Sequence, residues 1–252
     1  MVLSTARNPF YKGEHMEELS DFNKIECPFV RKRYHVTKGF KKHGNRLQLR
    51  EPVVYLVTPE IREGYEWVFE APDVRAVEKL DGTNVKVKVQ DGRLVALMNR
   101  KNVLDPLSIM SKGQTGPIIE GVFQAISKGY LPDNQETVGE VIGPKLQGNP
   151  YELPGHHYYP FDRAFDFMHY KSFYKHERTF ENFSAWFKDH LRSLYWMKIH
   201  NKGGWSNDAP FAEGVVFTQK DDQGRTRYAK LRRDMYPWYY EPYIEIGEEV
   251  GV

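Results

Sequence analysis

The chain has 252 residues, of which 40% are hydrophobic and 14% aromatic, so it can bury a sizeable core in one large domain or two small ones. Its single cysteine, Cys27, excludes an internal disulfide and a cysteine-rich zinc site, and this indicates a reducing compartment. The longest apolar run, 53–57, is far too short to cross a bilayer and no signal peptide opens the sequence, which predicts a cytoplasmic protein with no membrane partner.

Thirty-six basic and 34 acidic residues give a formal net charge of only +2, but this charge is distributed unevenly. Residues 1–50 carry eleven Lys or Arg against five Asp or Glu, a net of +6, whereas residues 51–252 carry a net of −4. The difference predicts two parts, a basic N-terminal arm or small subdomain over 1–50 and a larger domain over 51–252.

The basic charge is concentrated in residues 31–50, which contain eight Lys or Arg, two His and no acid, with Tyr34 and Phe40 interleaved. Cations that neutralise phosphates, together with rings that stack on unpaired bases, suit a nucleic-acid strand. The alternative is a solvated basic arm or a sheet edge on which lysines prevent aggregation. The candidate nucleic-acid-binding residues are Arg31, Lys32, Arg33, Lys38, Lys41, Lys42 and Arg46.

The first half of the larger domain is predicted to be rich in strands. Residues 53–57 and 67–70 are short runs of β-forming residues. Residues 84–90 alternate strictly between apolar and polar side chains, Asp91-Gly92 supplies a turn, and 93–98 returns, which predicts a β-hairpin.

The second half mixes helices with strands. Residues 118–128 form an amphipathic pattern that stops at a glycine, and 137–142 and 164–168 are predicted buried strands. Residues 179–197 predict a long helix, because aromatic and leucine side chains recur at three- and four-residue spacing after a threonine cap.

A second hairpin is predicted from 213–218 and 225–231 around a polar turn at 221–224. Hairpins with occasional helices, without regular βαβ alternation, indicate an α+β fold built on antiparallel sheets. The sequence contains neither a Walker A motif nor G-x-G-x-x-G, so P-loop and Rossmann folds have no support.

Lys79 is the strongest candidate for a reactive side chain. It ends an apolar segment and precedes a glycine turn, where a side chain can project into a cleft from a firmly held backbone. A nucleophilic lysine must lose its proton, which requires burial or nearby cations. The candidate cations are Arg100, Lys145, Lys230 and Arg232.

Five short motifs in a fixed order carry a family resemblance over about residues 70–235. The chain resembles the covalent nucleotidyltransferases, which include DNA ligases, RNA ligases and mRNA capping enzymes. The matching motifs are Lys79-Leu80-Asp81-Gly82, Val138-Gly139-Glu140-Val141-Ile142-Gly143, Phe165-Asp166-Phe167, Glu213-Gly214-Val215-Val216-Phe217 and Ala229-Lys230-Leu231-Arg232. Arg100 is at the place where this family has an arginine that contacts phosphate.

Details favour the RNA ligases. Glu78 before Lys79, Asn84 after it and the run 139–149 resemble the phage-type RNA ligases that seal nicks in duplex RNA. The fifth motif departs from the usual Lys-x-Lys, since Arg232 keeps the charge without offering a compact ammonium. Only 20 residues follow Arg232, too few for a C-terminal OB-fold, and no four-cysteine zinc module is present, so we expect a nucleotidyltransferase fold without either.

The resemblance implies an ATP-dependent RNA ligase that acts as a monomer on RNA with 5′-phosphate and 3′-hydroxyl ends. Lys79 would form lysyl-AMP, and Mg²⁺ or Mn²⁺ is expected because pyrophosphate leaves poorly unless its charge is neutralised. The implied roles are catalysis for Lys79, Lys230, Glu213 and Asn84, cofactor binding for Glu78, Lys79, Arg100, Glu140, Phe165, Glu213, Lys230 and Arg232, and metal binding for Glu213.

Each of these assignments has a structural alternative. Glu140 and Glu213 could be paired structural acids, Phe165 a core aromatic, and Lys230 with Arg232 a solvated strand face. The pair His156-His157 has no obvious third metal ligand, and the aromatic residues 236–240 are expected in the core. The alternative functions are a DNA ligase, a GTP-dependent capping guanylyltransferase, and a non-catalytic RNA-binding relic of this fold.

Overall fold

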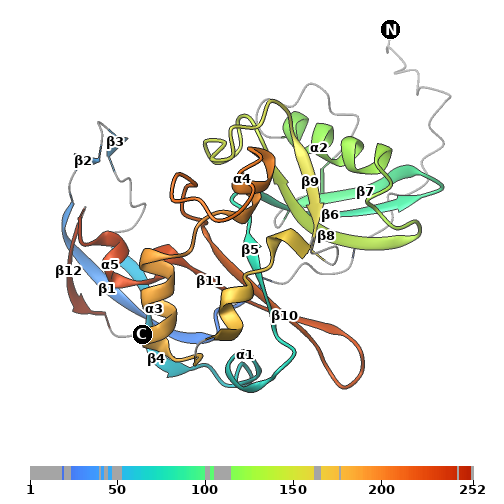
Figure 1. The fold of residues 1–252 in the computed structure, drawn as a ribbon. Coiled ribbons are helices and arrows are strands. Elements are labelled where there is room, and N and C mark those ends of the chain that lie inside the picture. Colours follow the sequence, from blue (N-terminus) through green and yellow to red (C-terminus); the bar gives the residue numbers. More distant parts are fainter. Residues whose placement is uncertain are drawn as a thin grey trace, which may run out of the picture.

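The computed structural model describes most of the chain from residue 24 onward, with internal gaps (Figure 1). The described residues are 19, 24–39, 41–42, 45–46, 53–99, 103–104, 115–161, 166–175, 177–242 and 244–250. Two expected site residues, Arg100 and Phe165, lie outside them, and so do the side chains of four candidate RNA contacts, Lys38, Lys41, Lys42 and Arg46. All described strand pairs are antiparallel, which confirms the expected mixed fold with antiparallel sheets.

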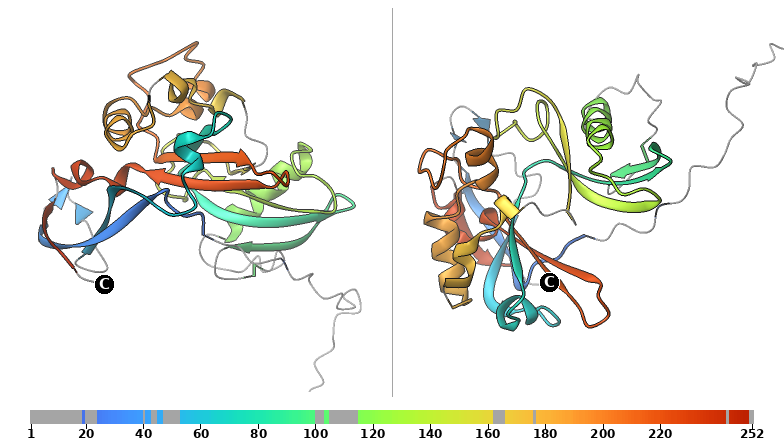
Figure 2. Two further views of the ribbon diagram at one scale, coloured as in Figure 1. Left: turned by 90° about the horizontal axis from the view of Figure 1, so that it is seen from below. Right: turned by 45° about the vertical axis from the view of Figure 1, so that its right-hand side comes forward.

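The sheet that carries Lys79 lies in the middle of the molecule (Figures 1 and 2) and has the strand order β11-β10-β5. Its strands are β5 (Arg75–Lys79), β10 (Gly214–Lys220) and β11 (Thr226–Arg232), so the predicted hairpin around 221–224 is confirmed. Gly214 pairs with Lys79 on one side and with Arg232 on the other. A Cβ atom on Gly214 would meet Leu231 O at 2.2 Å, so glycine is what lets the strands come together there.

A four-stranded sheet with the order β7-β6-β8-β9 lies to one side of this central sheet. It consists of β6 (Thr83–Gln90), β7 (Arg93–Asn99), β8 (Gln135–Ile142) and β9 (His157–Pro160), which confirms the hairpin predicted around Asp91-Gly92 and the strand predicted at 137–142. The helix α2 (Thr115–Ser127) corresponds to the helix predicted at 118–128, and it packs Ile118 and Val122 against the sheet.

The third sheet lies on the other side and has the order β12-β1-β4 (Figure 1). The strand β1 (Phe29–Gly39) comes from the basic stretch and is the central strand, flanked by β4 (Val53–Ile61) and β12 (Ile244–Glu249). The short strands β2 (Lys41–Lys42) and β3 (Asn45–Arg46) pair with each other. Strands from before and after residue 50 thus share one sheet.

The core beside this sheet is aromatic. Phe29 of β1, Phe183 of α3 (Phe180–Asp189) and Phe217 of β10 belong to one buried cluster, with ring centroids of Phe183 and Phe217 5.7 Å apart. Tyr236 is fully buried in it, as expected, while the short helix α5 (Pro237–Tyr240) that follows contains no fully buried residue.

Three predicted elements differ from the structure. Residues 67–70 form the helix α1 (Trp67–Glu70) instead of a strand, because a four-residue apolar run has no periodicity that separates the two. In the segment 164–168 the described part is a 3₁₀ helix, η1 (Asp166–Met168). The long helix predicted over 179–197 is two helices, since α3 ends at Asp189 and Ser193 caps a new helix, α4 (Leu194–Ile199), by accepting a hydrogen bond from Trp196 N–H.

The remaining described elements are two more 3₁₀ helices, η2 (Lys171–Lys175) and η3 (Arg233–Met235). Among the described residues, no helix has the length and apolar character needed to span a bilayer.

Candidate active site

Lys79 ends β5 at the turn that leads into β6, where the central and four-stranded sheets meet. The turn passes very close to β8, since a Cβ atom on Gly82 would lie 2.2 Å from Val141 O. Asp81 N–H donates a hydrogen bond of 2.8 Å to the buried hydroxyl of Tyr151. The backbone beside Lys79 is therefore fixed by close packing on one side and by a buried hydrogen bond on the other.

A cavity of about 730 Å³ opens beside this turn and is lined by all three larger sheets. It brings together six residues predicted from the sequence for catalysis or cofactor binding: Lys79, Asn84, Glu140, Glu213, Lys230 and Arg232. Its charged lining comprises five cations, Lys24, Arg31, Lys79, Lys230 and Arg232, and three carboxylates, Asp81, Glu140 and Glu213. Such a mixed lining can hold a polyanion and also accept protons.

Glu213 lies between Lys79 and Arg232. Its Oε2 accepts a short hydrogen bond from Lys79 Nζ, and its Oε1 lies 3.5 Å from Arg232 Nη1. Lys79 Nζ also donates to Leu80 O at 3.3 Å, and its side chain is only 15% exposed. The carboxylate of Glu213 thus accepts a hydrogen bond from the lysine and fixes the direction of its ammonium group.

Asp81 adds a second carboxylate beside Lys79, and it was not among the predicted site residues although it belongs to the first motif. Burial, reinforced by the negative charge of Glu213, raises the pKa of Asp81 to about 6, while Lys79 and Arg232 oppose the shift. Burial likewise raises the pKa of Asp234, which contacts Arg232 at 3.0 Å. The lysine is therefore surrounded by carboxylates that a cation or a proton would stabilise.

Asn84 and Glu140 face each other across β6 and β8. The Asn84 amide donates to Gly139 O at 2.9 Å and to Glu140 Oε2 at 3.4 Å, and Glu140 is only 5% exposed. Lys230 is also buried, and its backbone N–H donates to Glu26 O at 2.9 Å, which attaches the segment before β1 to the edge of the site.

Glu78, predicted to bind the cofactor, carries its carboxylate away from Lys79. Ser193 Oγ–H donates to it at 2.6 Å and Tyr195 N–H at 2.7 Å, so it lies against the first turn of α4. Burial raises the pKa of Glu78 to about 7. Alternation along a strand explains the placement, since consecutive side chains of β5 point to opposite faces.

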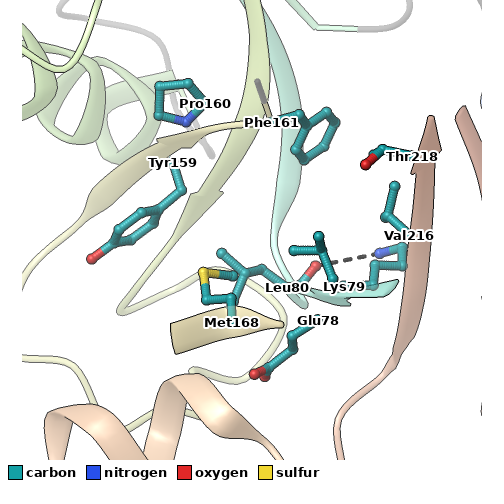
Figure 3. A pocket seen from close by; sticks show the side chains of 10 residues that line it. Glu78, Lys79, Leu80, Tyr159, Pro160, Phe161, Met168, Val216 and Thr218 are labelled. Atoms are coloured by element: carbon teal, nitrogen blue, oxygen red, sulfur yellow. Dashed lines mark hydrogen bonds between the residues drawn. The ribbon is translucent and has the colours of Figure 1, made fainter. Parts of the chain in front are cut away.

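A small apolar pocket borders Lys79 between the central sheet and β9 with η1 (Figure 3). Glu78, which was predicted for the site, lines this pocket beside Lys79. The lining also includes five residues that were not predicted: Tyr159, Phe161, Met168, Val216 and Thr218. Val216 and Thr218 are two apart on β10, so they share a face, and this periodicity was the only sequence signal for the pocket.

The basic stretch divides between the cavity and the surface. Arg31 lines the cavity, whereas the next residue, Lys32, is exposed and pairs with Glu249 at 3.0 Å. The guanidinium carbons of Arg31 and Arg33 each lie 6.0 Å from the Tyr55 ring centroid. Neither Arg31 nor Lys24 forms an ion pair with any described residue.

Within the described ranges, no three His, Cys, Asp or Glu side chains form a ready-made metal site. The His156 ring bonds to Glu120 at 2.7 Å and to Pro144 O, which makes it a structural group. Mg²⁺ and Mn²⁺ on a nucleotide commonly need only one or two carboxylates besides phosphate oxygens. The hard oxygen donors of Asp81 and Glu213 in this cavity fit that requirement.

No protein-family model and no curated protein matches the sequence. Solved structures of a Naegleria gruberi RNA ligase resemble the fold. The structure with PPi is 20% identical over 67% of this chain and 51% of that one, with a TM-score of 0.41. A mutant with AMP and Mn is 16% identical over 86% and 62%, with a TM-score of 0.43, and a mutant with ATP and Mn is 17% identical over 87% and 62%, with a TM-score of 0.41.

This chain thus spans about half of the length of the first of these ligases. Identities and TM-scores this low assign neither an activity nor residue roles to the chain.

Proposed function

We propose that this protein is an ATP-dependent RNA ligase that works through a lysyl-AMP intermediate. The observation that carries the proposal is the contact between Lys79 and Glu213 in a cavity that also contains Lys230, Arg232 and Glu140. The sequence motifs are far apart in the chain, and they supply these side chains from the strands β5, β8 and β11 and from the residue that precedes β10.

In the first step, Lys79 gives up its ammonium proton to solvent while Glu213 orients Nζ, and the neutral amine attacks the α-phosphate of ATP. The new bond joins Nζ to the α-phosphorus, the bond from that phosphorus to the bridging oxygen breaks, and Nζ releases a second proton to solvent. Pyrophosphate leaves with the electron pair. Lys230 and Arg232 would stabilise the charge on the α-phosphate, because fixed cations lower the barrier where negative charge develops.

In the second step, an oxygen of the RNA 5′-phosphate attacks the same phosphorus, the N–P bond breaks and Lys79 regains its proton. In the third step the RNA 3′-hydroxyl loses its proton to solvent and attacks the phosphorus of the 5′-phosphate. The bond from that phosphorus to the oxygen it shares with AMP breaks, and AMP leaves with the electron pair. Asn84 would act in these RNA-joining steps.

The nucleotide would be held by the groups around the cavity. Glu140 would contact the ribose, and Arg31 with Lys24 the β- and γ-phosphates, since these two cations line the cavity and form no ion pair with a described residue. Phe165 and Arg100 retain their proposed contacts to adenine and phosphate, although both lie outside the described residues.

A divalent metal ion would be held by Asp81 and Glu213 together with phosphate oxygens. Its chemistry there would be neutralisation of the charge on the pyrophosphate leaving group.

Covalent labelling tests the proposal directly. We expect α-labelled ATP with Mg²⁺ or Mn²⁺ to label the 29.6 kDa protein, and Lys79→Ala to abolish the label. Lys32→Ala, which removes an exposed lysine, is the matched control and keeps it. Absence of label from ATP, GTP and NAD⁺ alike would favour a non-catalytic relic, and label from GTP alone would favour a capping enzyme. Sealing of nicked RNA, single strands and nicked DNA would then define the substrate.

A further inference from the structure

Two adjoining cavities of about 510 and 680 Å³ lie around α4 and the loop after it, outside the catalytic cavity. Leu194 and Trp205 line both of them, so the Trp205 ring stands between the two. All five tryptophans lie in the described part of the chain, and Trp205 is the one that is exposed, at 53%. Its ring contacts no other ring among the described residues, so its large apolar face is available to a ligand. We call the two cavities together the Trp205 groove.

The Trp205 groove has a one-sided charge. Lys171 lines the larger cavity, and Lys198 and Lys202 line the smaller one. Among the described residues that line either cavity, none is an Asp or Glu. Among the described residues, the acid that pairs with one of these lysines is Asp208, which is 80% exposed and 3.9 Å from Lys202, and a pair so exposed is weak. The groove therefore attracts anions.

Polar side chains complete the lining. Asn182 and His190 lie in the larger cavity and Asn201 in the smaller one. Amide and imidazole groups can bond to the edge of an unpaired base, while an exposed indole offers a stacking face that any base can use. Cations, a stacking ring and hydrogen-bonding side chains in one open groove are the features that single-stranded nucleic acid requires. A duplex does not fit this description, since its bases are already stacked and paired.

The groove is also close to the catalytic strand. Phe167 lines the groove, and the next residue, Met168, lines the apolar pocket beside Lys79. His169, in the larger cavity, forms a bridge with Val77 of β5, two residues before Lys79. A strand of a few nucleotides can therefore reach from the groove toward the catalytic cavity.

We infer that the Trp205 groove binds an unpaired segment of the RNA substrate, with a base stacked on Trp205 and the backbone phosphates on Lys171, Lys198 and Lys202. That the strand is RNA rests on the proposed function, whereas the recognition of a single strand rests on the groove itself. The groove thus selects substrates that have an unpaired flank next to the end to be joined.

The test measures equilibrium binding of a labelled single-stranded RNA of about 12 nucleotides, and of the same RNA in duplex form, without ATP. We expect Trp205→Ala to weaken single-strand binding by about fivefold or more and to leave duplex binding unchanged. Trp205→Phe, which keeps a smaller stacking face, gives an intermediate affinity. The matched control is Phe123→Ala, because Phe123 is a 51% exposed aromatic on α2, and this variant binds like the parent protein.

The salt dependence tests the phosphate contacts. Lys198→Ala should reduce the slope of log affinity against log salt concentration by about 0.7, the value for one phosphate contact on a single strand. If Trp205→Ala and Phe123→Ala bind single-stranded RNA with equal affinity, the inference is overturned. It is also overturned if Trp205→Ala loses the same factor of affinity for single-stranded and for duplex RNA. The binding assay contains no ATP, so its result does not depend on the proposed ligase activity. A protein that binds single-stranded RNA in this way but is not labelled by ATP would support the inference about the groove and contradict the proposed function.

Discussion

The catalytic cavity and the Trp205 groove differ in how their charges are arranged. The cavity contains three carboxylates among five cations, and key members such as Glu140 and Lys230 are buried. The groove is lined by three lysines and by no described carboxylate, and all three lysines are exposed. Opposed charges in a partly buried site hold a nucleophile in one orientation, whereas exposed charges of one sign attract a polyanion. The arrangement of charges therefore suits the cavity to chemistry and the groove to binding of a strand.

Arg31 provides the strongest test of this division, because the sequence placed it with the docking residues and the structure places it in the cavity. We expect Arg31→Ala to slow lysyl-AMP formation by about 100-fold, since it removes a cation aimed at charge that develops during the step. Sealing of RNA that already carries a 5′-adenylate should keep its rate. The measurement is a single-turnover assay of each step.

Lys32→Ala is the matched control for Arg31→Ala. The two residues are consecutive on β1, but Lys32 pairs with Glu249 at the surface and does not line the cavity, so its removal leaves lysyl-AMP formation unchanged. If Arg31→Ala impaired sealing of adenylated RNA and spared lysyl-AMP formation, Arg31 would be a docking residue and the division between cavity and groove would fail at this position.

A substitution of Tyr151 tests whether lysyl-AMP formation depends on a fixed turn after Lys79. Tyr151→Phe removes the acceptor for Asp81 N–H, and an unsatisfied buried donor lets the turn beside Lys79 relax. We expect a fall of about tenfold in the rate constant for lysyl-AMP formation with little change in the KM for ATP. Tyr195→Phe is the control, because Tyr195 is similarly buried but its hydroxyl bonds to the Tyr159 hydroxyl at 2.8 Å instead of to the turn.

Both variants lose one buried hydroxyl and should be destabilised to a similar degree. Equal loss of rate in the two would mean that Tyr151 acts through stability alone.

Most residues of the candidate site could be predicted from the sequence, but the directions in which their side chains point could not. Short motifs identified Lys79, Glu140 and Glu213, and turn chemistry at Asp91-Gly92 predicted the first hairpin correctly. Sequence neighbours were then assigned one role, although Glu78 faces α4 while Lys79 faces the cavity. Side chains alternate between the two faces of a strand, but this alternation assigns a face to each neighbour only once the strand and its buried face are known.

Other features had no local signal. The helix α1 and the break before α4 depend on tertiary packing and on a serine cap within an otherwise periodic segment. Trp205 lies in a loop with no periodic pattern, so its exposure and its cationic neighbours emerge only when α3, α4 and η2 are brought together.

Glu78 connects the two regions, since it belongs to β5 and its carboxylate bonds to the first turn of α4, whose residues line the groove. Its pKa is about 7 in the folded protein against 4.5 for an ordinary glutamate, because burial disfavours the charged form. Between these values the folded state binds more protons than the unfolded state, so the free energy of unfolding decreases as pH rises from about 4.5 to 7.

Glu78→Gln should remove this dependence, because the amide can accept from Tyr195 N–H and donate to Ser193 Oγ at every pH. We expect the parent protein to lose up to about 3 kcal/mol relative to the variant between pH 5 and pH 8, measured by urea denaturation. Glu249→Gln replaces an exposed acid. In this variant the free energy of unfolding should change between pH 5 and pH 8 by the same amount as in the parent protein. A parallel pH profile for the Glu78→Gln variant and the parent would show that Glu78 stays charged against α4, and that cavity and groove are not linked by its protonation.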